Sequence, residues 1–127
     1  MSEIPVISII DDDESVRVAT NRLVKSLGFT AHTFASAQDF LQSPRLNDTS
    51  CLIVDVQMPG INGVELQSLL IAKGNRTPMI FITAFPDEGT RRQVLERGAL
   101  CFLSKPCDGS TLIQYLDMAL KGDQPQA

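Results

Sequence analysis

Residues 51–63, CLIVDVQMPGING, decide the fold of this chain. Leu52, Ile53 and Val54 form a short apolar run, which is typical of a strand buried on both faces of a parallel sheet. The run ends at Asp55, and the Pro, Gly and Asn residues that follow supply the chemistry of a turn. Burial of a carboxylate is costly unless the group is paired, bound to a metal or used in chemistry. Asp55 is therefore the first candidate functional residue.

Composition limits the class of protein. With 127 residues, 43% of them hydrophobic and 20% charged, the chain is long and apolar enough for one globular domain. The net charge of −4, without a cluster of Lys and Arg, argues against nucleic-acid binding by this segment. No apolar run has transmembrane length and the N-terminus does not resemble a signal peptide, so we expect no membrane association. Three cysteines without a CxxC pair fit the reducing cytoplasm.

Apolar runs alternate with amphipathic segments along the chain. Further strands are expected at 6–10, 30–34, 79–82 and 99–103. Helices are expected after the caps Asp13, Ser36 and Asp108, and over 64–73 and about 87–97. In the first helix Val16, Ala19, Leu23 and Leu27 would form the buried face, with Gly28 ending it. This alternation predicts an α/β domain over residues 1–121, with a doubly wound five-stranded parallel sheet and helices on both faces. Residues 122–127 are expected to be a linker or a disordered tail.

Polar residues follow four of the five predicted strands at their carboxyl ends, where ligands bind in such sheets. They are Asp11, Asp12, Asp55, Thr83 and Lys105. Three neighbouring carboxylates repel one another and favour a hard cation, Mg²⁺ or Mn²⁺. The lysine provides a positive charge for a phosphate, and the threonine a hydroxyl donor. One carboxylate could then act as a nucleophile and form an aspartyl phosphate.

Four motifs that carry these residues, IIDDDESVR, IVDVQMPGINGVEL, FITAF and GALCFLSKP, together resemble the response regulator receiver domain of two-component signalling. The resemblance covers residues 6–120 and is greatest to the regulators of nitrogen fixation and aromatic-compound catabolism. It implies a flavodoxin-like fold with strand order 2-1-3-4-5. It also implies a phosphohistidine donor, on a sensor histidine kinase or a phosphotransfer protein, and an output in transcription through a missing or separate module.

The resemblance assigns roles to the acidic residues. Asp55 matches the phosphoacceptor and Asp12 the direct metal ligand. Asp11 matches the acid that binds the metal through water, and the backbone carbonyl of Gln57 matches the third protein ligand.

Other positions match the phosphate contacts and the switch. Thr83 and Lys105 match the phosphate-contacting pair, Phe102 matches the aromatic switch position, and the Lys105–Pro106 bond is cis in the family. The side chains of Gln57 and Phe85 match positions that tune the lifetime of the phosphoryl group. The bulk of Phe85 predicts exclusion of water and a long lifetime. The 87–121 face is expected to form a homodimer or bind a partner on phosphorylation.

Three other functions are compatible with parts of this pattern. A metal-dependent phosphatase would also use an aspartyl phosphate, but such enzymes usually carry a second acid two residues after the nucleophile, where this chain has Gln57. A scaffold that works without phosphorylation would have no use for the acidic set. A flavodoxin-like FMN carrier would need a hydroxyl-rich loop where Asp11 and Asp12 lie. The expected protein therefore catalyses only its own phosphorylation and dephosphorylation.

Overall fold

The computed structural model describes residues 4–121, and over these residues it contains a five-stranded parallel sheet in the order β2-β1-β3-β4-β5. The predicted fold is confirmed, including the strand order that came from the resemblance. The elements are β1 Val6–Ile10, α1 Glu14–Ser26, β2 Thr30–Phe34, α2 Ala37–Leu41, the short 3₁₀ helix η1 Pro44–Asn47, β3 Cys51–Asp55, α3 Gly63–Ala72, β4 Met79–Thr83, α4 Glu88–Glu96, β5 Cys101–Ser104 and α5 Gly109–Lys121. The predicted tail, 122–127, lies outside the described residues.

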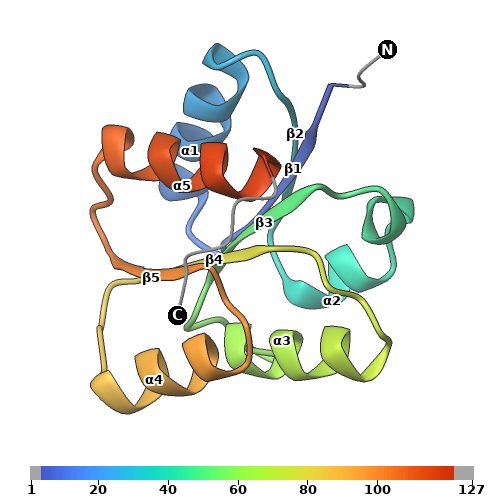
Figure 1. The fold of residues 1–127 in the computed structure, drawn as a ribbon, viewed down its shortest axis with the longest axis vertical. Helices are drawn as coiled ribbons and strands as arrows, with labels where there is room; N and C mark the ends of the chain where they lie inside the picture. Colours follow the sequence, from blue (N-terminus) through green and yellow to red (C-terminus); the bar gives the residue numbers. More distant parts are fainter. Residues whose placement is uncertain (1–3, 122–127) are drawn as a thin grey trace.

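Helices cover both faces of the sheet. Helices α1 and α5 lie on one face, and α2, α3 and α4 on the other (Figure 1). Alternate residues of the central strands therefore enter two separate cores. Ile53 packs with α1 and α5, whereas its neighbours Leu52 and Val54 pack with α2, α3 and α4. This two-sided burial is the reason why the strands are continuous apolar runs rather than alternating ones.

Burial extends to the last residue of the two central strands. Every residue of β3 and β4 is buried, so Asp55 at the end of β3 is 4% exposed and Thr83 at the end of β4 is fully buried. Two polar groups thus end the most buried strands of the sheet, at its carboxyl edge.

Helix α3 begins at Gly63, one residue earlier than predicted. Asn62, read from the sequence as a turn residue, is its N-cap and forms a capping box with Glu65. A Cβ atom at position 63 would lie 2.6 Å from the carbonyl oxygen of Asp55 and 3.1 Å from Cα of Val56. Glycine therefore lets α3 start directly against the end of β3, which holds the loop after Asp55 in place.

Strand β5 runs over Cys101–Ser104, so the prediction of 99–103 was wrong by two residues at its start. The N–H of Ala99 donates to the carbonyl of Val94, and Gly98, at a φ of 105°, donates to Leu95. These two bonds are a Schellman-type end of α4, so residues 98 and 99 complete the helix and cannot yet belong to the strand.

The buried face of α1 also differs from the prediction. Val24 is its one fully buried residue, Val16, Leu23 and Leu27 pack partly on the core, and Ala19 is exposed. The buried face of α1 is centred near Val24, on the side of the helix that also carries Val16 and Leu27. Ala19 lies outside this face, on the outer side of the helix.

Candidate functional site

Three carboxylates meet at the carboxyl edge of the sheet, as predicted. One oxygen each from Asp11, Asp12 and Asp55 lies within 4.8 Å of the others. Asp11 follows β1 and Asp55 ends β3, and these two strands are adjacent. Asp11 and Asp55 are buried, whereas Asp12 is exposed. The cluster therefore has two buried acids and one acid that faces solvent.

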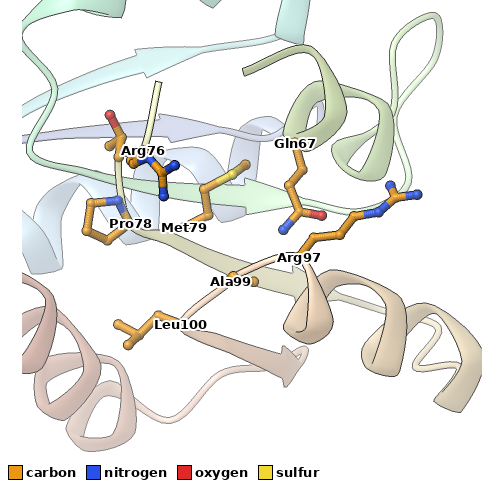
Figure 2. Close-up of a pocket in the computed structure, with 9 residues that line it drawn as sticks. Gln67, Arg76, Pro78, Met79, Arg97, Ala99 and Leu100 are labelled. Atoms are coloured by element: carbon orange, nitrogen blue, oxygen red, sulfur yellow. The ribbon is translucent and has the colours of Figure 1, made fainter. Parts of the chain in front are cut away.

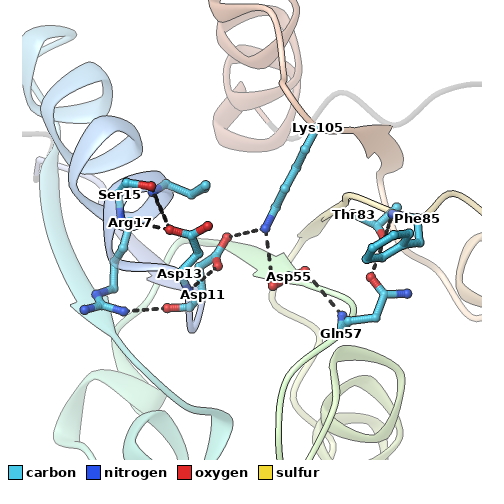
Figure 3. A network of polar contacts seen from close by, with 10 residues as sticks. Asp11, Asp13, Ser15, Arg17, Asp55, Gln57, Thr83, Phe85 and Lys105 are labelled. Atoms are coloured by element: carbon cyan, nitrogen blue, oxygen red, sulfur yellow. Dashed lines mark hydrogen bonds and ion pairs between the residues drawn. The ribbon is translucent and has the colours of Figure 1, made fainter.

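Lys105 bridges the two buried acids (Figure 3). Its Nζ lies 3.0 Å from Oδ2 of Asp11 and 3.3 Å from Oδ2 of Asp55. Lys105 follows β5 directly, so its side chain reaches past β4 to the acids of β1 and β3. Partial burial disfavours the charged ammonium, but the bond and the charges of Asp11 and Asp55 outweigh that effect and raise the pKa of Lys105. The group therefore stays cationic at neutral pH.

The carboxyl group of Asp55 lies in an environment that disfavours its charged form. Burial, followed by repulsion from Asp11, raises its pKa to about 6, although the ammonium of Lys105 acts in the opposite direction. A raised carboxyl pKa means that the anion is more basic and more poorly solvated than that of an ordinary aspartate. An added cation would relieve this repulsion.

Asp11 is held in place by the chain that follows it. Its Oδ1 accepts the N–H of Asp13 at 2.9 Å, and its backbone carbonyl accepts Nη1 of Arg17 at 2.8 Å (Figure 3). Asp13 itself accepts bonds from the N–H groups of Ser15 and Val16 as the N-cap of α1, as predicted. The role of Arg17 was not anticipated, since no spacing in the sequence indicates it.

Thr83 and Gln57 contact each other beside Asp55. The hydroxyl of Thr83 donates to Oε1 of Gln57 at 2.5 Å and accepts the N–H of Phe85 at 3.0 Å (Figure 3). The N–H of Gln57 donates to Oδ1 of Asp55 at 3.3 Å. A bond between the two side chains was not predicted, because it joins residues 26 positions apart.

The remaining predicted residues lie around this group. The ring of Phe85 is 73% exposed, so it stands at the rim of the site rather than inside it. Phe102 is half-buried on β5, beside Phe81 of β4, and packs against the core under α3 and α4. The Lys105–Pro106 bond is cis, as the resemblance implied.

The donor set fits a hard divalent cation. Carboxylate oxygens are the ligands that Mg²⁺ prefers, and three of them lie close enough to share one ion. Asp12 and the neighbouring turn of 56–59 border an open hollow, which leaves room for water and phosphate oxygens beside the acids.

Comparisons with known proteins show what the chain is similar to. Residues 7–117 match the family model described as the response regulator receiver domain. The chain is 34% identical over 112 residues to transcriptional regulatory protein TdiR of Thauera aromatica, covering 88% of this chain and 49% of that protein. It is 36% identical over 116 residues to response regulator protein TodT of Pseudomonas putida (strain F1), covering 91% and 51%.

A solved structure of response regulator StyR is similar in both sequence and fold. It superposes with a TM-score of 0.88 at 36% identity, covering 95% of this chain and 61% of that one. The chain spans about half the length of the curated relatives it matches. Among the helices of residues 4–121, none has both the length and the apolar character that a membrane span requires.

Proposed function

Because the chain belongs to the response regulator receiver domain family, we propose that Asp55 accepts a phosphoryl group from a histidine kinase. The observation that carries this proposal is the ammonium of Lys105, which lies 3.0 Å from Asp11 and 3.3 Å from Asp55. An activated carboxylate, a countercharge and a nearby pair of acids are what an acyl phosphate needs to form and persist.

The chemistry follows from these positions. A carboxylate oxygen of Asp55 attacks the phosphorus of a phosphohistidine, the P–N bond breaks, and its electron pair returns to the imidazole. Asp12, Asp55 and the carbonyl of Gln57 would hold Mg²⁺ directly and Asp11 would hold it through water, and the ion would neutralise charge on the phosphoryl oxygens. Lys105 moves from its pairing with the two acids to a phosphoryl oxygen. The hydroxyl of Thr83 exchanges its bond to Gln57 for a bond to another phosphoryl oxygen.

The surface formed by residues 87–121 would pass the signal on to a partner. Val94 is the one buried residue of α4, so this helix is held by few core contacts and can shift at small cost. We propose that phosphorylation changes this surface, through Thr83 and Phe102, to promote a homodimer or bind an output module. Relatives named as transcriptional regulatory proteins favour control of transcription. We further propose that the chain acts in the cytoplasm. Beyond its own phosphorylation and dephosphorylation, the chain would catalyse no reaction.

Phosphorylation by a small donor tests the central proposal. Incubation with acetyl phosphate and Mg²⁺ is expected to add one phosphoryl group, visible as one mass increment in the intact protein. Peptide mapping after the reaction should place the group on the peptide that contains Asp55. No mass increment with any acyl or phosphoramidate donor would overturn the proposal and favour a scaffold.

Mg²⁺ is expected to raise the thermal stability of the protein. The ion binds the folded acid cluster and not the unfolded chain, so saturation at about 100 times the dissociation constant would add about 2.7 kcal/mol. Thermal melts with and without millimolar Mg²⁺ measure the shift. Asp12→Asn should reduce it, whereas Asp13→Asn, a capping residue outside the cluster, should keep it. Equal midpoints for the native chain with and without metal would contradict the site.

Phe85 is expected to prolong the life of the phosphoryl group. The resemblance places the side chain of Phe85 beside the path of the water molecule that would attack the phosphorus, and its backbone N–H bonds to Thr83 of the site. Glutamate at this position could bind and orient that water, whereas the ring cannot. Decay of phosphorylated protein after donor removal should be several-fold faster in Phe85→Glu than in the native chain, with Phe85→Leu as the control that keeps the apolar character. Equal rates for all three proteins would exclude the ring as a shield.

A further inference from the structure

The hydroxyl of Thr83 forms two hydrogen bonds in this structure, and neither goes to the phosphoacceptor. It donates its single proton to Oε1 of Gln57 at 2.5 Å and accepts the backbone N–H of Phe85 at 3.0 Å (Figure 3). Thr83 is fully buried, so water does not compete for these bonds. Lys105, by contrast, already lies 3.3 Å from Asp55. Of the two proposed contacts of the phosphoryl oxygens, Lys105 is therefore in place and the proton of Thr83 is directed elsewhere.

The length of the bond between Thr83 and Gln57 is that of a hydroxyl donating to an oxygen. A separation of 2.5 Å lies at the short end of the range for O–H···O bonds, about 2.5–3.0 Å, and below the range of about 2.7–3.2 Å for N–H···O bonds. The amide oxygen of Gln57 thus accepts the only proton that the hydroxyl has. Phosphoryl oxygens are acceptors. Thr83 can donate to one of them only after its bond to Gln57 has been broken, so the two acceptors compete.

Gln57 contributes to the site through its backbone and, separately, through its side chain. Its backbone N–H donates to Oδ1 of Asp55 at 3.3 Å, and its backbone carbonyl is the proposed metal ligand. The bond to Thr83 uses the side chain alone. Because Gln57 is exposed, its side chain can be replaced without opening the core. A substitution at this position therefore removes the bond to Thr83 and keeps the backbone groups that face Asp55 and the metal.

The bond from Thr83 to Gln57 also bears on the start of α4. Phe85, whose N–H bonds to Thr83, lies in the short loop between β4 and α4. The other end of α4 is tied to α3, because Nε2 of Gln67 donates to the backbone carbonyl of Val94 at 2.9 Å. Figure 2 shows the side chain of Gln67 reaching from α3 toward this end of α4. Helix α4 is thus anchored to α3 at its C-terminal end, whereas its N-terminal end follows a loop held by Thr83 and Gln57.

We propose that Gln57 is a positioning residue that restrains Thr83. Its amide oxygen holds the hydroxyl away from the phosphoryl oxygens and, through the N–H of Phe85, steadies the loop before α4. This inference rests on the proposed phosphorylation of Asp55. The aspartyl phosphate supplies a charged acceptor, which forms a stronger hydrogen bond than the neutral amide and displaces it. Loss of the restraint therefore loosens Phe85 in the unphosphorylated protein and strengthens binding of a phosphoryl group or its analogue at Asp55.

Amide hydrogen exchange tests the restraint without phosphorylation. Gln57→Met keeps an unbranched side chain but offers no amide oxygen, so the hydroxyl of Thr83 loses its acceptor and holds the N–H of Phe85 less firmly. In the absence of Mg²⁺ and of any phosphoryl donor, the amide of Phe85 should exchange about fivefold faster in Gln57→Met than in the native chain, the factor expected for one hydrogen bond of ordinary net strength.

Two controls accompany this measurement. The amides of residues 94–99, at the anchored end of α4, should exchange in Gln57→Met as they do in the native chain. Gln42→Met changes a glutamine that follows α2, outside the site, and should leave the exchange of Phe85 unchanged. Equal exchange of Phe85 in the native chain and in Gln57→Met would overturn the restraint.

Beryllofluoride tests the competition at Asp55. With Mg²⁺ this ion binds a carboxylate oxygen and presents three fluorine acceptors in place of the phosphoryl oxygens. In titrations followed by ¹H–¹⁵N spectra, Gln57→Met should bind it about fivefold more tightly than the native chain. Thr83→Val removes the hydroxyl, so adding Gln57→Met to that variant should change nothing. A gain that persists without the hydroxyl would overturn the restraint, because Gln57 would then act by another route.

The outcomes separate this inference from the proposed function. Mg²⁺ should raise the melting temperature of Gln57→Met as much as that of the native chain, because the proposed carbonyl ligand belongs to the backbone. If the native chain binds no beryllofluoride, the proposed function fails, and the exchange of Phe85 still decides whether Gln57 restrains Thr83. If the native chain and Gln57→Met bind beryllofluoride equally tightly, the restraint alone is refuted.

Discussion

Asp55→Asn is expected to take up no phosphoryl group from acetyl phosphate under conditions that label the native chain fully. The amide keeps the size of the side chain but loses the anionic oxygen that attacks phosphorus. It also removes one of the two like charges buried beside Lys105, so the variant should fold at least as well as the native protein. Burial and repulsion from Asp11 raise the pKa of Asp55 to about 6, and this unfavourable charge disappears in the variant.

The matched control is Asp13→Asn. Asp13 lies two residues after Asp11 and caps α1, and it forms no ion pair with Lys105. Asparagine is also a good N-cap, so this variant should label as the native chain does. Intact-mass analysis compares the three proteins at equal donor concentration. Labelling of Asp55→Asn at the native level would place the phosphoryl group on another residue and end the assignment.

Gly63→Ala is expected to lower the free energy of unfolding by about 1–3 kcal/mol, the usual cost of forcing extra volume into a packed site. The new methyl group would meet backbone, 2.6 Å from the carbonyl oxygen of Asp55, and backbone cannot rotate away as a side chain can. Helix α3 must then move from β3, which also shifts the loop that carries Gln57. We therefore expect slower phosphorylation together with the loss of stability, both measured on the same preparation by urea unfolding and by labelling.

Gly109→Ala is a suitable control, because Gly109 is also the first residue of a helix, α5. A Cβ there would come no closer than 3.8 Å to Leu23, which is ordinary contact, so alanine should be neutral or slightly stabilising. If Gly63→Ala unfolds at the same urea concentration as Gly109→Ala, α3 has room against β3 and the close approach is not a constraint.

The sequence alone predicted the fold and the three carboxylates that gather at the carboxyl edge of the sheet. Buried strands, turns and caps are local properties, so β1 and β2 have the predicted bounds and Asp55 ends β3 as expected. The parallel arrangement follows from the alternation of strands and helices, and it brings all strand ends to one edge. For this reason Asp11, Asp12 and Asp55 could be grouped before any coordinates were considered, and the structure places them together.

Helix ends were less predictable. Whether residues 98 and 99 start β5 or finish α4 depends on which carbonyl their N–H groups reach, and the apolar character of Ala99 is compatible with both. Likewise, Asn62 and Gly63 have the composition of a turn, and only the contact between α3 and β3 makes them a cap and a helix start.

Only the tertiary structure decided how the site residues pair. The order of strands sets how far Lys105 reaches, and its Nζ comes to rest between Asp11 and Asp55, 94 and 50 residues away along the chain. The bonds from Thr83 to Gln57 and from Gln67 to Val94 likewise depend on the packing of elements that are distant in sequence. Local pattern determines which side chain ends each strand, because backbone conformation is set by near neighbours. Distances between such side chains, and therefore their charges and hydrogen bonds, are set by how the helices close the sheet.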